Sequence, residues 1–185
     1  DGGGVCRPMY GENGRNREIM NMGITEIVID PTDNDMLYMA TDEGILISED
    51  GGGSWKEFSA GLANRDIFTL GIGEDGSLYA GTRGYGVYKL DRDNKVWDQT
   101  RPLGNFGVHW SVWERPLYQY SDLLINPEDP DVMYLASFPT GMFKSTDGGE
   151  TWEEKNTGLI EDGVDGIFSL CFHPEDKDII YAGTY

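Results

Sequence analysis

Two eight-residue stretches share a pattern of residue types that could place carboxylates for catalysis. Residues 48–55 read SEDGGGSW and residues 145–152 read STDGGETW, so Ser, Asp, Gly, Gly and Trp recur at the same spacing. A pair of acids is what the hydrolysis of a glycosidic bond requires. A pattern that recurs with fixed spacing is equally typical of a turn that is repeated in every structural unit. Asp50 and Asp147 therefore have two interpretations, one catalytic and one structural.

Other acidic residues also occupy positions that suit catalysis. Asp30 ends one apolar segment, where Asn126 and His173 occupy the matching positions of similar segments, and Asp122 matches Glu26 earlier in such a segment. We take Asp30 and Asp122 as candidate catalytic acids. The opposing interpretation for Asp30 is a cap on the turn that follows, and a chain with 33 acidic residues contains many accidental pairs.

The stretch RPLGNFGVHWSVWERPLYQY, residues 101–120, is unusually rich in aromatic residues. A long connection between strands is a common position for binding residues. Exposed tryptophans there could stack on sugar rings or hold a peptide, whereas the alternative is a hydrophobic plug between structural units. The candidate ligand-binding residues are His109, Trp110, Trp113, Tyr118 and Tyr120.

The sequence contains no convincing metal or cofactor motif. The two histidines do not form a zinc site by spacing, and the two cysteines, Cys6 and Cys171, can be either paired or free. Residues 91–94, DRDN, are similar to part of a calcium loop but are not followed by its glycine and bidentate glutamate. We predict no metal site and no cofactor, with Ca²⁺ as the one ion still to be considered.

The charge of the chain limits its partners. Its 33 acidic and 14 basic residues give a net charge of −19, which repels nucleic acid and anionic membrane surfaces. The sequence also lacks an apolar run of about 18 residues, so we predict no membrane insertion. A protein or a glycan remains as the expected partner.

The candidate residues are carried by an internal repeat. Pro31, Pro127 and Pro174 each stand seven residues before a tyrosine, with aspartates two and four positions after the proline. A degenerate copy at 70–97 keeps the tyrosine and a final tryptophan but has Arg92 where the other copies have aspartate. Successive tyrosines are 41, 55 and 47 residues apart, a period typical of β-propeller blades.

Each repeat reads as four short strands that are separated by turn residues. In the first repeat we expect strands at 26–30, 36–41, 44–48 and 54–58. Proline and aspartate favour a turn after the first strand, and the Asp-Gly-Gly sequence favours a hairpin in which glycine supplies positive φ. The sequence therefore predicts an all-β fold of four-stranded antiparallel sheets, with the inner strands buried on both faces between neighbouring sheets.

The repeat resembles the Asp-box, or BNR, repeats of β-propellers, and most of all the blades of sortilin-type receptors, xyloglucanase-type glycoside hydrolases and photosystem assembly factors. The resemblance implies that the carboxylates of Asp50 and Asp147 accept hydrogen bonds from backbone N–H groups of their own turns, and that the tryptophans pack beneath. It favours a structural role for both stretches. The residues of that role are Ser48, Asp50, Gly51, Trp55, Ser145, Asp147, Gly148 and Trp152.

The repeats predict a partial β-propeller with three complete blades. The predicted units are 1–22 (partial), 23–62, 63–100, 119–160 and 166–185 (partial), with 101–118 as an aromatic insertion between blades. An open set of blades would expose sheet edges and apolar faces. We therefore expect the rest of a longer propeller chain, or an assembly partner, to cover them.

Two functions are compatible with this sequence. One is a non-catalytic binding or scaffolding propeller, extracellular, on the cell surface or periplasmic, that recognises a protein or glycan through its blade loops. It is favoured because no complete catalytic set can be assembled from the residues. The other is a glycoside hydrolase, xyloglucanase-like or sialidase-like, whose catalytic acids are partly outside this segment.

Overall fold

The computed structural model describes residues 22–83, 85–100, 119–138, 141–159 and 166–184. Within these ranges the regular elements are all β-strands, which form four antiparallel sheets of consecutive strands. No helix of the described part of the chain is long and apolar enough to span a bilayer. The prediction of an all-β fold with four-stranded antiparallel sheets is confirmed.

Three of the sheets have four described strands and the last has two. The first sheet contains β1 (Ile24–Asp30), β2 (Asp33–Thr41), β3 (Gly44–Ser48) and β4 (Lys56–Glu57). The second contains β5 (Ile67–Ile72), β6 (Leu78–Thr82), β7 (Gly86–Asp91) and β8 (Val96–Gln99). The third contains β9 (Gln119–Ile125), β10 (Met133–Phe138), β11 (Gly141–Ser145) and β12 (Glu153–Glu154), and the fourth contains β13 (Ile167–Phe172) and β14 (Ile180–Thr184).

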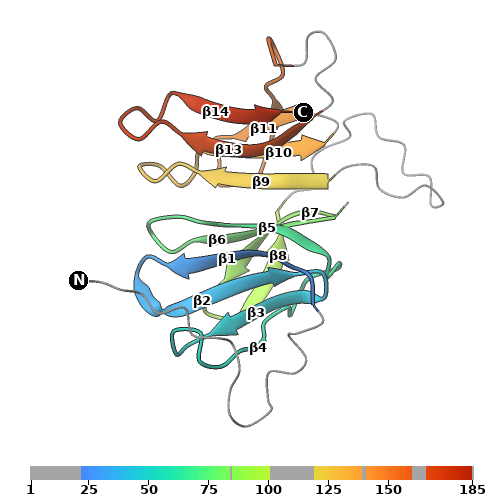
Figure 1. The fold of residues 1–185 in the computed structure, drawn as a ribbon, viewed down its shortest axis with the longest axis vertical. Helices are drawn as coiled ribbons and strands as arrows, with labels where there is room; N and C mark the ends of the chain where they lie inside the picture. The colour runs from blue at the N-terminus through green and yellow to red at the C-terminus, as the bar shows by residue number, and fades with distance from the viewer. Residues whose placement is uncertain (1–21, 84, 101–118, 139–140, 160–165, 185) are drawn as a thin grey trace, which may run out of the picture.

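The first strands of successive sheets lie next to one another. β1 contacts β5, β5 contacts β9, and β9 contacts β13, so these four strands form the inner edge of the arrangement (Figure 1). Within each sheet the later strands follow outward in chain order. The chain then returns from the outermost strand of one sheet to the innermost strand of the next.

The core lies between the faces of successive sheets. One apolar cluster joins Tyr38 and Ile47 of the first sheet to Leu70 and Trp97 of the second. Two further clusters occupy the second and third junctions in the same way. Because side chains alternate along a strand, each sheet uses one face for the preceding sheet and the other face for the following one.

Gly71 lies where the facing sides of the second and third sheets approach closely. A Cβ atom at Gly71 would lie 3.0 Å from Ile125 Cδ1 and 3.1 Å from Leu123 Cδ2 on the inner strand of the third sheet. Both of these side chains are buried in the cluster between the second and third sheets. Glycine at this position therefore lets β5 and β9 pack together without a displaced side chain.

The expectation that every inner strand is buried on both faces is wrong for β1. The side chains of Ile27 and Ile29 are 45% and 55% exposed, whereas Leu123 and Ile125 at the corresponding positions of β9 are 5% and 8% exposed. The difference arises because β1 packs on β5 across one face only, whereas β9 packs between β5 and β13.

Two strand boundaries in the first repeat also differ from those predicted. β2 begins at Asp33 instead of Met36, because Asp33 pairs with Asp30 across a tight turn at Pro31 and Thr32. The fourth strand is only Lys56–Glu57, shorter than the predicted 54–58. The expected positive φ of the hairpin glycines is confirmed, with φ of 66° at Gly51 and 89° at Gly52.

We predict that the substitution Gly71→Ala lowers the free energy of unfolding by roughly 1–3 kcal/mol, because the added methyl group forces Leu123 and Ile125 apart. Chemical denaturation measures this change. Gly23→Ala is the matched control, since its Cβ would meet only the flexible carboxylate of Asp42; we expect a change within about 0.5 kcal/mol there. Equal effects of the two substitutions would contradict this account of the β5–β9 junction.

Candidate functional site on the inner strands

One equivalent position of each inner strand carries a polar side chain. The strand register places Glu26, Thr69, Asp122 and Ser169 at equivalent positions, opposite Ala40, Gly81, Ala136 and Gly183 respectively. The opposing residues are all alanine or glycine, which leaves room for the polar side chain at the inner edge of each sheet. Carboxylates and hydroxyls thus alternate from one sheet to the next.

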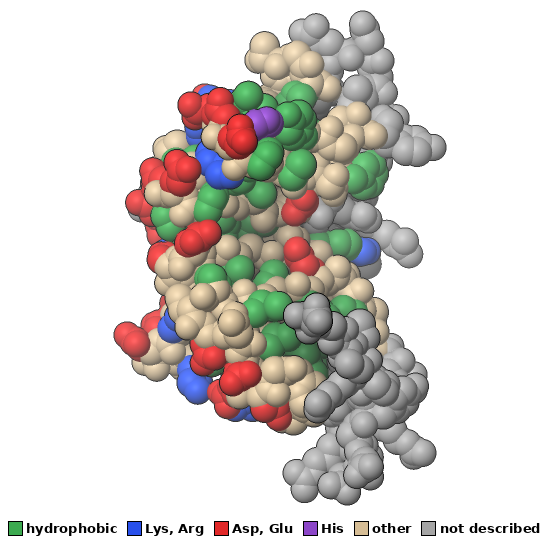
Figure 2. Space-filling view, turned by 60° about the vertical axis from the view of Figure 1, so that its left-hand side comes forward, with side chains coloured by type: hydrophobic (Ala, Val, Ile, Leu, Met, Phe, Trp, Pro, Cys, Tyr) green, Lys and Arg blue, Asp and Glu red, His purple; other side chains and the backbone are tan. Residues whose placement is uncertain are grey.

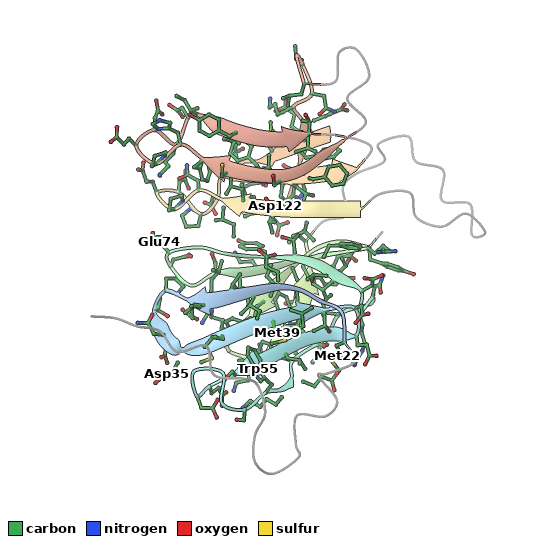
Figure 3. The ribbon with its side chains drawn as sticks, viewed as in Figure 1. Met22, Asp35, Met39, Trp55, Glu74 and Asp122 are labelled. Carbon is green, nitrogen blue, oxygen red and sulfur yellow. The ribbon has the colours of Figure 1, made fainter. Side chains whose placement is uncertain are left out.

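The two carboxylates each bind the backbone of the following sheet. The N–H of Leu70 donates to Glu26 Oε2 at 2.6 Å, and the N–H of Leu170 donates to Asp122 Oδ2 at 2.7 Å. Both bonds run from one inner strand to the next, β1 to β5 and β9 to β13. Figure 3 labels Asp122 on β9. Each half-buried carboxylate is therefore held in place by the neighbouring sheet.

The environment of these acids favours their protonated forms. Burial raises the pKa of Glu26, the hydrogen bond from Leu70 N–H opposes this increase, and the negative charge of Asp122 adds to it. Burial likewise raises the pKa of Asp122, against the opposing effect of the Leu170 N–H bond. An acid whose pKa is raised retains its proton to higher pH and can donate it. Glu26 and Asp122 thus share one property of a general acid–base site, a raised pKa.

Asp30 is in a different environment. Its side chain is 1% exposed, and its carboxylate accepts hydrogen bonds from the Thr32 N–H at 2.9 Å, the Thr32 hydroxyl at 2.6 Å and Arg92 Nη2 at 2.7 Å. Burial would raise the pKa of Asp30, but the bonds from Thr32 and Arg92 outweigh this effect and lower it. Asp30 is therefore an ionised, enclosed carboxylate at the end of β1, and the two candidate acids of the sequence are held by separate sets of partners.

The two Ser-x-Asp-Gly-Gly stretches form closed hydrogen-bonded turns. In the first, Asp50 Oδ1 accepts the Ser54 N–H at 2.7 Å and the Ser48 hydroxyl at 2.8 Å, and Asp50 Oδ2 accepts the Ser54 hydroxyl at 2.7 Å. The Ser48 hydroxyl oxygen in turn accepts the Gly52 N–H at 2.8 Å. The carboxylate of Asp50 is therefore hydrogen-bonded within its own turn, between β3 and β4.

The second turn has the same network. Asp147 Oδ1 accepts the Thr151 N–H and the Ser145 hydroxyl, each at 2.8 Å, and the Thr151 hydroxyl donates to Asp147 Oδ2. Gly149 N–H donates to the Ser145 hydroxyl oxygen at 2.9 Å. The indole of Trp152 is buried and donates to Gly149 O at 3.0 Å. The two networks are in different sheets and each closes on itself.

Most of the candidate ligand-binding residues lie outside the part of the chain that the structure describes. His109, Trp110, Trp113 and Tyr118 lie outside the described residues. Tyr120 is in β9, where its backbone pairs with Ser137. A ligand-binding role for these residues remains a prediction.

The described residues also contain no group of three or more His, Cys, Asp or Glu side chains that could hold a metal ion. In the loop 91–94 the carboxylate of Asp91 instead accepts hydrogen bonds from the N–H groups of Asp93 and Asn94 and from the Asn94 side chain. Cys171 is a free, exposed thiol. Cys6 lies outside the described residues.

Sequence reasoning noticed that Glu26 and Asp122 occupy matching positions but did not connect them with the next sheet. The signal available in the sequence was the repeat itself, which aligns the two acids. The hydrogen bonds from Leu70 and Leu170 depend on how the sheets pack. The spacing of residues within one strand does not indicate that packing.

Comparison with known proteins supports the fold. No model of a known protein family matches the chain. A probable oligoxyloglucan-reducing end-specific xyloglucanase of Neosartorya fischeri is 22% identical over 149 residues, which cover 71% of this chain and 17% of that protein. The chain therefore spans only a small part of this relative.

The chain is similar in fold to solved structures of GH74 enzymes. The GH74 xyloglucanase of Xanthomonas campestris has a TM-score of 0.67 and 17% identity, covering 88% of this chain and 27% of the enzyme. The GH74 enzyme of Niastella koreensis has a TM-score of 0.62 and 19% identity, covering 86% of this chain and 28% of the enzyme. Together with the four-stranded sheets, these similarities identify the fold as that of a β-propeller.

The closed turn at Asp50 generates a prediction about acid stability. The bonds from the Ser54 hydroxyl and N–H lower the pKa of Asp50 from 3.8 to about 2. The folded state therefore holds this carboxylate ionised more strongly than the unfolded state does, so its stabilising effect is complete above the ordinary pKa and disappears as the pH falls towards the folded value.

We accordingly expect Asp50→Asn to lower the unfolding free energy near neutral pH, and the difference from the original protein to shrink between about pH 4 and pH 2. Urea denaturation across this range measures it. Asp35→Asn is the matched control, because the backbone oxygen of Asp35, not its carboxylate, accepts the Gly51 N–H. A deficit of Asp50→Asn that does not change with pH would contradict the proposed role of the charge.

At Glu26 we expect the opposite dependence of stability on pH. Because its pKa is raised in the folded protein, ionisation destabilises the fold as the pH rises from the ordinary value of 4.5 through the folded one. Glu26→Gln keeps an oxygen that can accept the Leu70 N–H and removes the charge. We therefore expect higher stability than the original protein at pH 7 and no difference well below pH 4.5, measured by thermal unfolding, with the exposed Glu43→Gln as control. Lower stability of Glu26→Gln at pH 7 would show that the charge itself is stabilising.

Proposed function

We propose that this chain is a segment of a β-propeller that binds β-glucans of the xyloglucan type and takes part in their hydrolysis. The single observation that carries the proposal is the pair Glu26 and Asp122, two half-buried acids with raised pKa values on inner strands of the first and third sheets. The likeness to xyloglucanases supports the choice of substrate class. Because the chain covers only part of those proteins, the activity of the whole molecule is part of the proposal.

In this proposal one acid of the pair donates a proton to the glycosidic oxygen, so that the bond between this oxygen and the sugar carbon breaks and the leaving sugar departs as an alcohol. The other acid, as a carboxylate, takes a proton from the water molecule whose oxygen forms the new bond to that carbon. The negative charge of Asp122 raises the pKa of Glu26, which favours a state in which Glu26 is protonated while Asp122 is ionised. Asp30 has no part in the chemistry, because Thr32 and Arg92 already occupy its carboxylate.

A polysaccharide substrate also sets the proposed location and the role of the repeated turns. Polymers of this kind do not cross membranes, so the protein would act outside the cytoplasm. We further infer that residues 48–55 and 145–152 are Asp boxes that brace the hairpins of their blades. Support comes from the two matching networks in which each carboxylate is used within its own turn.

A specific observation favours the second candidate function, a non-catalytic binding propeller. The carboxylates of Glu26 and Asp122 both accept inter-sheet backbone hydrogen bonds, and a purely structural side chain would do the same. In that case the protein would bind a glycan or protein through its loops, with residues 101–118 as the prime candidates.

The test uses xyloglucan and its oligosaccharides, with sialosides as an unrelated substrate class. We expect release of reducing ends that falls by about 10²–10⁴-fold in Glu26→Gln and Asp122→Asn, with binding of the oligosaccharide retained. Asp30→Asn is the control acid. The folded Asp30→Asn variant should keep the turnover of the original protein at every substrate concentration. Saturable binding of xyloglucan without any turnover would contradict hydrolysis and support the binding function. Absence of binding would overturn both proposed functions.

A further inference from the structure

A β-bulge interrupts each inner strand directly before the polar position described above. The register of each inner strand with the next strand skips one residue there, and the skipped residues are Thr25, Phe68, Ser121 and Phe168. A bulge bends its strand locally and can change the direction in which a side chain points. The first and third sheets, which have a carboxylate at the polar position, have a small hydroxyl residue at the bulge, whereas the second and fourth have a phenylalanine.

Phe68 lies on the inner strand of a sheet that is packed between two neighbours. The apolar cluster towards the first sheet contains Ile67 and Leu70 of β5, and the cluster towards the third sheet contains Tyr79 and Val87. Phe68 belongs to neither of these clusters of described residues, although a phenyl ring is among the largest apolar groups that a strand can bury. Its side chain is half-buried even though both neighbouring sheets are present.

The guanidinium of Arg83 contacts the Phe68 ring. Arg83 Cζ lies 4.5 Å from the ring centroid, a distance typical of a cation–π contact. Arg83 Nε forms an ion pair with Asp66 Oδ2 at 3.0 Å, and the backbone N–H of Arg83 donates to Asp66 O at 3.0 Å. The guanidinium carries further N–H donors besides that of Nε. An aromatic ring, a carboxylate and several hydrogen-bond donors therefore meet at the start of β5.

This group of side chains lies beside the proposed acid Glu26. The N–H of Leu70, two residues after Phe68, donates to Glu26 Oε2 at 2.6 Å. The hydroxyl of Thr25 donates to Ile67 O, directly before Phe68, at 2.8 Å. Side chains of β1 thus bind the backbone of β5 on both sides of Phe68, and a ligand held at this ring would be adjacent to the Glu26 carboxyl.

We propose that Phe68 and Arg83 form a sugar-binding subsite next to Glu26, in which a neutral hexose unit of a β-glucan stacks on the phenyl ring and its hydroxyls accept hydrogen bonds from the guanidinium. The C–H groups of a sugar ring form an apolar face that can pack on an aromatic ring, whereas its hydroxyls need polar partners. The choice of a β-glucan rests on the function proposed above, whereas the subsite itself rests on the contacts of Phe68 and Arg83.

The charge of the chain favours a neutral sugar over an acidic one. The net charge is −19, and acidic side chains gather along the left-hand side of the surface in Figure 2. Such a surface repels an anionic polysaccharide. Because Asp66 pairs with Arg83, the subsite adds no net positive charge that would attract an anion. Binding of the neutral sugar should therefore depend only weakly on the sodium chloride concentration.

Isothermal titration calorimetry of the full protein with a xyloglucan oligosaccharide tests the subsite. The Glu26→Gln variant serves as the parent, because we expect it to bind the oligosaccharide without hydrolysing it. In this background Phe68→Leu keeps an apolar side chain but removes the ring, and should raise Kd about five- to tenfold. Phe68→Tyr keeps the ring and should bind within about twofold of the parent.

Arg83→Met supplies a second, independent measurement. It should weaken binding about threefold or more, because the sugar hydroxyls lose hydrogen-bond donors. Arg65→Met is the matched control: Arg65 also pairs with a carboxylate, at 2.6 Å, but its partner Glu57 is on β4, the outermost strand of the first sheet. Thermal unfolding verifies that each variant is folded. If Phe68→Leu does not fold, the comparison of Arg83→Met with Arg65→Met decides.

The outcomes separate the subsite from the proposed hydrolysis. Unchanged affinity of folded Phe68→Leu, or equal weakening by Arg83→Met and Arg65→Met, would overturn the subsite even if turnover depends on Glu26. Weaker binding by both Phe68→Leu and Arg83→Met would support the subsite even if the protein with Glu26 intact shows no turnover. A parent that binds no oligosaccharide would overturn the subsite.

Discussion

The structure depends on the need of each four-stranded sheet to cover both of its faces. A single sheet of this size would expose apolar side chains on both faces. Successive sheets, from the one that begins with β1 to the one that begins with β13, stack on one another and cover these faces. A close approach occurs at Gly71 between β5 and β9, where an added Cβ would approach Ile125 and Leu123 to about 3 Å. At the β1–β5 and β9–β13 junctions the inner strands lie near enough for the carboxylates of Glu26 and Asp122 to accept hydrogen bonds from the backbone of the following sheet.

The degenerate repeat uses its altered residues for the same packing. Where the first and third sheets have an aspartate that closes its own turn, the second has Arg92, whose guanidinium reaches Asp30 in the first sheet at 2.7 Å. The tryptophan of this repeat, Trp97, donates its indole N–H to Phe58 O in the connection between the first and second sheets at 2.7 Å. A local turn contact has thus been replaced by two contacts between sheets.

The carboxylates of this chain therefore include some with lowered and some with raised pKa values. Asp50 and Asp147 are surrounded by donors within their own turns, which lowers their pKa values, whereas Glu26 and Asp122 are partly buried with a single inter-sheet backbone donor and have raised pKa values. Burial is the main cause of the raised pKa values of Glu26 and Asp122, whereas hydrogen bonds within their own turns are the main cause of the lowered pKa values of Asp50 and Asp147.

The sequence by itself determined the repeat, the all-β fold and the short turns. Strand periodicity, proline, aspartate and glycine act over a few residues, so their consequences can be read from neighbours in the chain. The positive φ of Gly51 and Gly52 is such a consequence. Tertiary structure alone decided that Asp30 is enclosed by Arg92, 62 positions later, that Glu26 binds Leu70, and that Ile29 and Tyr181 are exposed. These outcomes depend on which sheet faces are covered, and that is set by contacts between sheets that lie tens of residues apart in sequence.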